Sequence, residues 1–202
     1  MTRLFLVRHA HADWRPDEAR PLSKRGRHAS ATVADLLAAA DIAAIYSSPA
    51  RRAVETIEPL AHRTGLRPVI VNDLRERELP VQPARDFAEV VHYSWLHPDE
   101  APSGGESLIA AQARGLHVIR TLASRHSDKS VVVATHGNLL ACVVNGLDSA
   151  YGYDFWRGMT FPDVYELQLR ENGLQGIRRV WSGAAQQRDA ADEAQGGTPA
   201  AS

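Results

Sequence analysis

Short apolar runs alternate with segments of helical periodicity along this chain. Runs of strand length, each ended by polar residues, lie at 4–7, 42–46, 69–71 and 130–134. Apolar residues recur at helix spacing across 23–40, 106–125 and 139–147. Strand patterns at 164–169 and 174–180 flank a Glu171-Asn172-Gly173 turn and predict a closing hairpin. The alternation predicts an α/β fold, a three-layer α/β/α sandwich around a mostly parallel central sheet.

Histidine follows two of the predicted strands. Arg8 and His9 end the first strand, and His136 with Gly137 comes directly after the strand at 130–134. Ligands of open α/β sheets bind beyond the carboxyl ends of the strands, so both imidazoles are expected at one crevice. An imidazole can be a nucleophile, a base or a metal ligand there, and the guanidinium beside His9 favours an anion such as phosphate over a cation.

A second group of polar residues follows the strand at 42–46. Ser48 is expected to cap a helix that has Pro49 at its first position. Helix N-termini bind anions, and Arg51 or Arg52 can add hydrogen bonds to phosphate oxygens. One of these two arginines is expected to be only a solvated helix charge.

A carboxylate lies between cations in the loop after the strand at 69–71. Glu76 is flanked by Arg75 and Arg77, where it could act as a general acid. By itself this segment is equally consistent with a solvated, charged loop.

Short motifs then follow one another in a fixed order along the chain. They are Leu6-Val7-Arg8-His9, Ser47-Ser48-Pro49-x-x-Arg52-Ala53, Leu74-x-Glu76, Gly104-Gly105-Glu106-Ser107 and Thr135-His136-Gly137. In this order and spacing they resemble the histidine phosphatase superfamily, the phosphoglycerate-mutase-like enzymes, over roughly residues 3–181. The resemblance implies the phosphoglycerate-mutase-like fold. It also implies a reaction that needs no metal and no cofactor.

The resemblance assigns roles to five residues. His9 would be the nucleophile that becomes phosphohistidine, and Glu76 would be the proton donor. Arg8, Arg52 and His136 would form the phosphate pocket.

The chemistry of phosphoryl transfer asks for these residue types independently. A nucleophilic imidazole must be neutral, and nearby arginine charges lower its pKa. Fixed guanidinium groups, a second imidazole and backbone N–H groups stabilise the charge that spreads over the phosphoryl oxygens. An acid beside a poor leaving group contributes roughly 10²–10⁴-fold. Water can then attack the phosphohistidine, with Glu76 returning as the base.

The sequence departs from the mutases of this family. Arg15 stands where the mutases carry a phosphate-contacting Asn, and the stretch from Glu76 to Gly104 is shorter than their insertion over the site. A more open site admits water to the phosphoenzyme, whereas a mutase must exclude it. Ala10 replaces the Gly that usually follows Arg-His, and a positive φ there would cost stability or shift the nucleophile. We therefore expect a phosphomonoester hydrolase.

Substrate selection is expected from loops around the crevice. Residues 84–105 are predicted to form a cap, although ordinary packing accounts for most of its apolar side chains, and 151–161 could also contact the organic group. The candidate substrate-binding residues are Arg15, Ser48, Gly137, His92 and Trp95. The sequence does not distinguish sugar phosphates, phosphoglycerates, nucleotides and cofactor precursors as substrates.

Composition limits the domain organisation and the partners. The 202 residues, 44% hydrophobic and 23% charged, suit one catalytic domain over 1–182, followed by a tail at 183–202 that is expected to be disordered. Lys and Arg number 23 against 24 Asp and Glu, and the net charge of −1 favours neither nucleic acid nor an anionic membrane as a partner. We expect a small-molecule phosphomonoester as the partner. The oligomeric state is left open.

The compartment expected from the sequence is the cytoplasm. Cys142 is the only cysteine, so an intrachain disulfide is excluded, and its apolar helical surroundings favour a core position. The apolar runs stay below the roughly 18 residues that indicate a membrane span, and the N-terminus has no signal-peptide pattern.

Other functions stay open as alternatives. Nine histidines allow a metal site, but no pair has the His-Glu-x-x-His spacing of a helical metalloprotease site. A non-catalytic phosphate-binding module would need neither a nucleophile nor an acid. Mutase-type phosphotransfer and removal of phosphate from phosphohistidine in a protein are the remaining alternatives. Family members of that last type are shorter and lack the cap.

Overall fold

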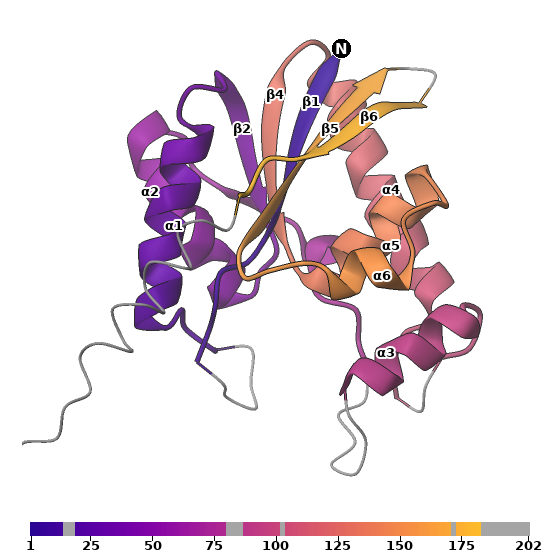
Figure 1. The fold of residues 1–202 in the computed structure, drawn as a ribbon. Coiled ribbons are helices and arrows are strands. Elements are labelled where there is room, and N and C mark those ends of the chain that lie inside the picture. The colour runs from indigo at the N-terminus through magenta and orange to yellow at the C-terminus, as the bar shows by residue number, and fades with distance from the viewer. Residues whose placement is uncertain (14–18, 80–86, 102–103, 171–172, 183–202) are drawn as a thin grey trace, which may run out of the picture.

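One mixed sheet forms the centre of the protein. The computed structural model describes residues 1–13, 19–79, 87–101, 104–170 and 173–182. Within these residues the sheet has the order β3-β2-β4-β1-β5-β6 (Figure 1). Its strands are β1 Thr2–Arg8, β2 Ile42–Ser47, β3 Val69–Ile70, β4 Ser130–Thr135, β5 Asp163–Arg170 and β6 Gly173–Arg179. The first four are parallel to one another, and β5 and β6 are antiparallel additions, so the predicted, mostly parallel sheet is confirmed.

Helices cover both faces of this sheet, with α1 and α2 on one side and α4 and α5 on the other (Figure 1). α3 lies beyond one end of the strands, beside α6 (Figure 1). The helices are α1 Lys24–Leu37, α2 Arg51–Thr64, the 3₁₀ helix η1 Asn72–Leu74, α3 Phe87–Leu96, α4 Leu108–Arg125, α5 Gly137–Leu147 and α6 Tyr153–Arg157. The predicted three-layer α/β/α sandwich is confirmed.

Side chains of the central strands alternate between two hydrophobic cores. In β1, Leu4 and Leu6 join the core under α4 and α5, whereas Phe5 and Val7 join the core under α1 and α2. This follows from the two-residue period of a strand. Because a parallel sheet is covered on both faces, its strands are apolar throughout, which explains the continuous apolar runs of the sequence.

Some helix starts differ from the expected ones. α2 begins at Arg51 with Ala50 as its N-cap, so the prediction that Ser48 caps this helix is wrong. The Ser48 hydroxyl instead accepts from the Ala50 N–H at 3.2 Å and contacts His136. This tertiary contact fixes the residue outside the helix.

The fourth helix also starts later than its sequence pattern suggests. α4 is capped by Ser107, whose hydroxyl accepts from the Ala110 N–H at 3.1 Å. The predicted start at Glu106 is therefore wrong. Ser103, the first residue of a Ser-x-x-Glu capping-box pattern that ends at Glu106, lies outside the described residues.

The predicted hairpin closes the sheet. β5 pairs antiparallel with both β1 and β6, and Gly173 adopts a positive φ of 113° at the start of β6. Glu171 and Asn172 lie outside the described residues, as do 84–86 and 102–103 of the predicted cap and the whole predicted tail at 183–202. The assignment of 1–182 to one domain stays a prediction.

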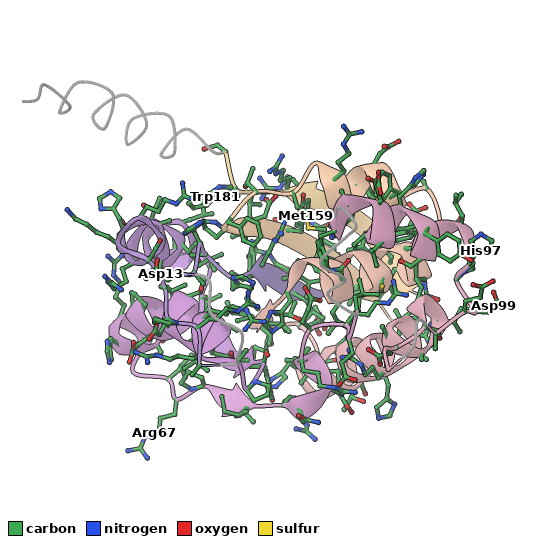
Figure 2. The ribbon with its side chains drawn as sticks, turned by 90° about the horizontal axis from the view of Figure 1, so that it is seen from below. Asp13, Arg67, His97, Asp99, Met159 and Trp181 are labelled. Carbon is green, nitrogen blue, oxygen red and sulfur yellow. The ribbon has the colours of Figure 1, made fainter. Side chains whose placement is uncertain are left out.

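The carboxyl ends of the parallel strands meet at one edge. Beyond β1, the His9 N–H donates to the Thr135 carbonyl at 3.0 Å, and beyond β2 the Ser48 N–H donates to the Ala134 carbonyl at 2.9 Å. Figure 2 views the protein from below, onto this edge. The ladder thus brings segments far apart in the sequence to one place.

Candidate active site

His9 is buried at the end of β1 with only 8% of its surface exposed. Its Nδ1 lies 2.8 Å from the Ala10 carbonyl oxygen, which can only accept, so Nδ1 carries the proton of the neutral ring. The lone pair is therefore on Nε2. Arg52 Nε donates toward this nitrogen at 3.3 Å. This lone pair makes Nε2 the atom of the ring that can act as a nucleophile.

The surroundings of His9 keep its ring uncharged. Burial is the main cause that lowers the pKa of His9 to about 3, and the positive charges of Arg52 and Arg8 contribute to this value against the opposing effect of the Ala10 carbonyl. A neutral imidazole over the whole physiological range is the form that nucleophilic attack requires.

His136 lies fully buried beside His9, with the two ring centroids 5.2 Å apart. Its Nε2 is 2.7 Å from the Ser48 hydroxyl, and its Nδ1 is buried with no hydrogen-bond partner in the described part of the chain. Because Ser48 Oγ already accepts from the Ala50 N–H, its own proton is available for His136 Nε2. Burial holds the pKa of His136 well below its usual value. With Ser48 as the donor to Nε2, the neutral ring carries its proton on Nδ1.

Arg8 is nine-tenths buried and held on several sides. Its Nη1 donates to the Met159 carbonyl at 3.1 Å, and its guanidinium carbon lies 3.5 Å from the centre of the Phe161 ring. A Cβ placed on Gly137 would come within 2.9 Å of this guanidinium, so glycine permits the close approach. Burial lowers the pKa of Arg8 to about 10, which still leaves it charged at neutral pH. Its Nε is buried without a partner among the described residues.

The first turn of α2 supplies Arg52, which is 2% exposed, whereas Arg51 is exposed and pairs with Glu55 at 2.6 Å. Of the two predicted arginines, the structure therefore brings Arg52 to His9. The hydroxyl of Thr56 donates to the Arg52 carbonyl at 2.6 Å and accepts from the Ala10 N–H at 2.9 Å. Sequence reasoning missed Thr56. Its position one helical turn after Arg52, on the same face of the helix, is the feature of the sequence that could have indicated it.

The alanine after the nucleophile is accommodated without strain. Positive φ angles at non-glycine residues in the described ranges occur at Asp41 and Asp128 and not at Ala10. Ala10 is fully buried. The cost expected from a positive φ at this position does not arise.

Glu76 lies at the N-terminus of α5. Its Oε1 accepts from the Leu139 N–H at 3.0 Å, and its Oε2 accepts from the Asn138 N–H at 3.3 Å. The negative charge of Glu76 raises the pKa of Arg8 against the larger effect of burial. The acid predicted from the sequence therefore stands at the helix that His136 caps, on the Arg8 side of the site.

Two other candidate residues, His92 and Trp95, are not joined to this cluster by the described contacts, and a third is not described. Arg15 lies outside the described residues. His92 is exposed with its ring 4.5 Å from that of Tyr153, and Trp95 is half-buried against the core under α4 and α5. None of the described hydrogen bonds or ring contacts links His92 or Trp95 to His9. Substrate contacts by these residues stay predictions.

Neither a group of metal ligands nor a membrane-spanning helix is found in the described ranges. Among these residues, no three His, Cys, Asp or Glu side chains are grouped as a metal ion would require. None of the helices in the described part of the chain has the length and apolarity to cross a membrane.

Comparison with known proteins identifies the family of the chain. A sequence profile of the histidine phosphatase superfamily (branch 1) matches residues 4–180. Glucosyl-3-phosphoglycerate phosphatase of Mycolicibacterium vanbaalenii is 28% identical over 165 residues, which cover 72% of this chain and 73% of that protein. Phosphoserine phosphatase 1 of Hydrogenobacter thermophilus is 25% identical over 189 residues, 85% of this chain and 90% of that protein.

A solved structure agrees with the fold. The structure of mycobacterial glucosyl-3-phosphoglycerate phosphatase with inorganic phosphate matches with a TM-score of 0.72 and 26% identity, covering 91% of this chain and 98% of that one. These similarities confirm the predicted fold, family and enzyme class: the chain belongs to branch 1 of the histidine phosphatase superfamily and is one of its phosphatases.

Proposed function

We propose that this phosphatase hydrolyses small phosphomonoesters without a metal ion, through a phosphohistidine on His9. The observation that carries the proposal is the arrangement of buried nitrogens around that ring. Arg8 Nε and His136 Nδ1 are both buried without partners in the described residues, while His9 is neutral with its lone pair on Nε2. A phosphoryl group would satisfy both donors and meet the nucleophile at once.

The first step transfers the phosphoryl group. His9 Nε2 attacks phosphorus, the bond between phosphorus and the ester oxygen breaks, and the departing oxygen takes a proton from Glu76. Arg8 and Arg52 supply fixed positive charge where the oxygens gain negative charge, and His136 Nδ1 donates a hydrogen bond. In the second step a water oxygen attacks phosphorus, the bond to Nε2 breaks, and Glu76 takes the proton of that water.

The position of Glu76 sets a condition on the proton transfers. Both of its carboxyl oxygens accept N–H bonds from the start of α5. The carboxyl group must therefore direct one oxygen to the leaving group when it transfers the proton. The acid role is supported by its place beside His136 and Arg8.

The substrate is part of the proposal. The relatives named above are a glucosyl-3-phosphoglycerate phosphatase and a phosphoserine phosphatase, which supports a small organic phosphomonoester here. The short stretch between Glu76 and Gly104 favours hydrolysis over the mutase reaction. We also place the enzyme in the cytoplasm.

The decisive experiment is an assay with EDTA present. Purified protein is incubated with p-nitrophenyl phosphate, O-phosphoserine and 3-phosphoglycerate, and both phosphate release and 2-phosphoglycerate formation are followed. We expect phosphate release that EDTA does not reduce. His9→Ala should abolish it, and His117→Ala, which removes an exposed histidine of α4, should not.

Each contrary outcome removes a different part of the proposal. Loss of activity with EDTA would overturn metal independence. Formation of 2-phosphoglycerate without phosphate release would replace the hydrolase by a mutase. Full activity in folded His9→Ala would remove the phosphohistidine. If none of these esters releases phosphate, the remaining functions are a non-catalytic phosphate-binding module and a protein phosphohistidine phosphatase.

A further inference from the structure

Arg114 of α4 makes an unusually complete set of hydrogen bonds. Its Nη1 donates to the carbonyls of Asp73 and Arg75 at 2.7 and 3.0 Å, and its Nη2 donates to the Glu76 carbonyl at 3.3 Å. Its Nε and Nη2 also donate to the two carboxylate oxygens of Glu106, both at 2.7 Å. These bonds use all the N–H groups that a guanidinium has.

The segment that Arg114 contacts leads directly to Glu76. It is the short helix η1 and an irregular turn, whose carbonyls have no ladder of a sheet or long helix to join. The Leu74 carbonyl accepts from the Thr135 hydroxyl at 2.8 Å. Every carbonyl from Asp73 to Glu76 thus accepts a hydrogen bond from a side chain.

Glu106 fixes the other side of this guanidinium. Its N–H donates to the Glu78 carbonyl at 2.7 Å, and its carbonyl accepts from Arg77 Nε at 3.0 Å. Burial would raise the pKa of Glu106, but the hydrogen bonds and charge of Arg114 outweigh it and the pKa is lowered. The side chains of the pair are only 11% and 13% exposed. Glu106 therefore stays ionised and holds Arg114 in a bidentate pair.

We propose that Arg114, oriented by Glu106, is a positioning residue that aims the Glu76 carboxyl group at the leaving oxygen. The inference rests on the proposed function, since it takes Glu76 to be the acid. Arg114 makes no contact with Glu76 beyond the main chain, so it acts on the direction of the acid and not on its charge. A misplacement of about 1 Å at a reacting group can cost on the order of 10²-fold in rate.

A purely structural role predicts a different behaviour. A loosened fold would slow all esters alike, because every substrate uses the same nucleophile and phosphate pocket. A displaced acid slows only esters whose leaving oxygen needs a proton. The dependence of rate on the leaving group therefore separates the two roles.

The test uses aryl phosphates of nearly constant shape. The value of kcat/KM is measured for p-nitrophenyl, phenyl and p-methoxyphenyl phosphate in Arg114→Lys, Arg114→Met, Glu106→Gln and the reference variant Glu76→Gln. Lysine keeps the charge but has three donors in place of five. Arg120→Met, which removes an exposed arginine from the same helix, is the matched control. Thermal unfolding of each variant shows whether it is folded.

We expect the loss to be selective for the poor leaving groups. For each variant we compare the fall in kcat/KM for phenyl phosphate with the fall for p-nitrophenyl phosphate. The fall for phenyl phosphate should be larger by roughly tenfold in Arg114→Lys and by roughly a hundredfold in Arg114→Met. Glu106→Gln should follow Arg114→Lys in direction. Arg120→Met should match the wild type with every ester. If Arg114→Met does not fold, Arg114→Lys and Glu106→Gln carry the test.

The outcomes separate this inference from the proposed function. Selective losses in Glu76→Gln but equal losses with all esters in the Arg114 and Glu106 variants would overturn the positioning role and leave the acid in place. Equal losses in Glu76→Gln would overturn the acid and the positioning role with it. Absence of phosphate release from every ester in the wild type would overturn the proposed function itself.

Discussion

Replacing Ser48 by alanine would test whether its hydroxyl determines which nitrogen of His136 carries the proton. The hydroxyl is fully buried and lies 2.7 Å from His136 Nε2, while it accepts from the Ala50 N–H. In the wild type this donation leaves the proton on Nδ1, where it can serve phosphate. In Ser48→Ala the ring can take the other tautomer, which turns a lone pair toward the phosphoryl oxygens.

The size of the effect follows from the buried pair. His136 is fully buried, so the lost bond leaves Nε2 without a partner and should lower the free energy of unfolding by about 1–3 kcal/mol. Loss of a donor to the transition state costs roughly 10²–10³-fold in kcat. Because phosphate itself still selects the donating tautomer, we expect a smaller fall in kcat/KM, roughly 10- to 100-fold.

The assay combines activity and stability. The value of kcat/KM for p-nitrophenyl phosphate, inhibition by inorganic phosphate and urea unfolding are measured for Ser48→Ala and for Ser30→Ala. Ser30 is a buried serine of α1 that bonds only to the Arg27 carbonyl in the described contacts. The control should keep its activity. Reduced stability of Ser48→Ala with unchanged kcat/KM and unchanged phosphate inhibition would refute the tautomer argument.

Two other predictions follow from the contacts of the site. Gly137→Ala places a methyl group against the Arg8 guanidinium, so kcat/KM should fall roughly tenfold or more. Gly176→Ala, which has open space at its Cβ, should leave kcat/KM unchanged in the same assay. The free energy of unfolding should fall as the pH falls, because His9 has a pKa of about 3 in the folded protein and an ordinary value of 6.5 in the unfolded chain. Below about pH 6.5 the unfolded chain binds the extra proton, so the slope of the free energy of unfolding against pH that this residue causes grows to about 1.4 kcal/mol per pH unit near pH 5. In urea unfolding, the free energy of unfolding of His9→Ala should depend less steeply on pH than that of the wild type. The same slope in both proteins would exclude the depressed pKa of His9.

The edge of the sheet that carries the site was predictable from the sequence. The run at 4–7 is long enough for a buried strand and too short for a helix, and polar residues follow it, as they follow the run at 130–134. Strand ends of a parallel sheet gather at one edge, which brings His9 and His136 together without further information. The geometry of the candidate phosphate-binding residues is thus largely a consequence of the sheet topology.

The supporting contacts were not predictable in this way. Ser48 looks like a helix cap because its neighbours in sequence favour one, yet its partner His136 is 88 residues away. Arg114 resembles any helix arginine, and besides the Glu106 carboxylate its acceptors are main-chain carbonyls, which no residue type reveals. A local sequence pattern shows which hydrogen-bond donors and acceptors a residue has. Which distant group accepts depends on packing that the pattern does not contain.

The start of α5 explains why these contacts concentrate where they do. His136 is its N-cap, the Cα of Gly137 lies against Arg8, and the N–H groups of Asn138 and Leu139 hold Glu76. The N–H groups of a first helical turn have no partners within the helix, so this turn can serve anionic groups. Its residues are buried through Val144, which makes it a rigid support. Variation in substrate choice should therefore arise in α3 and α6, whose exposed and half-buried rings lie outside the first turn of α5.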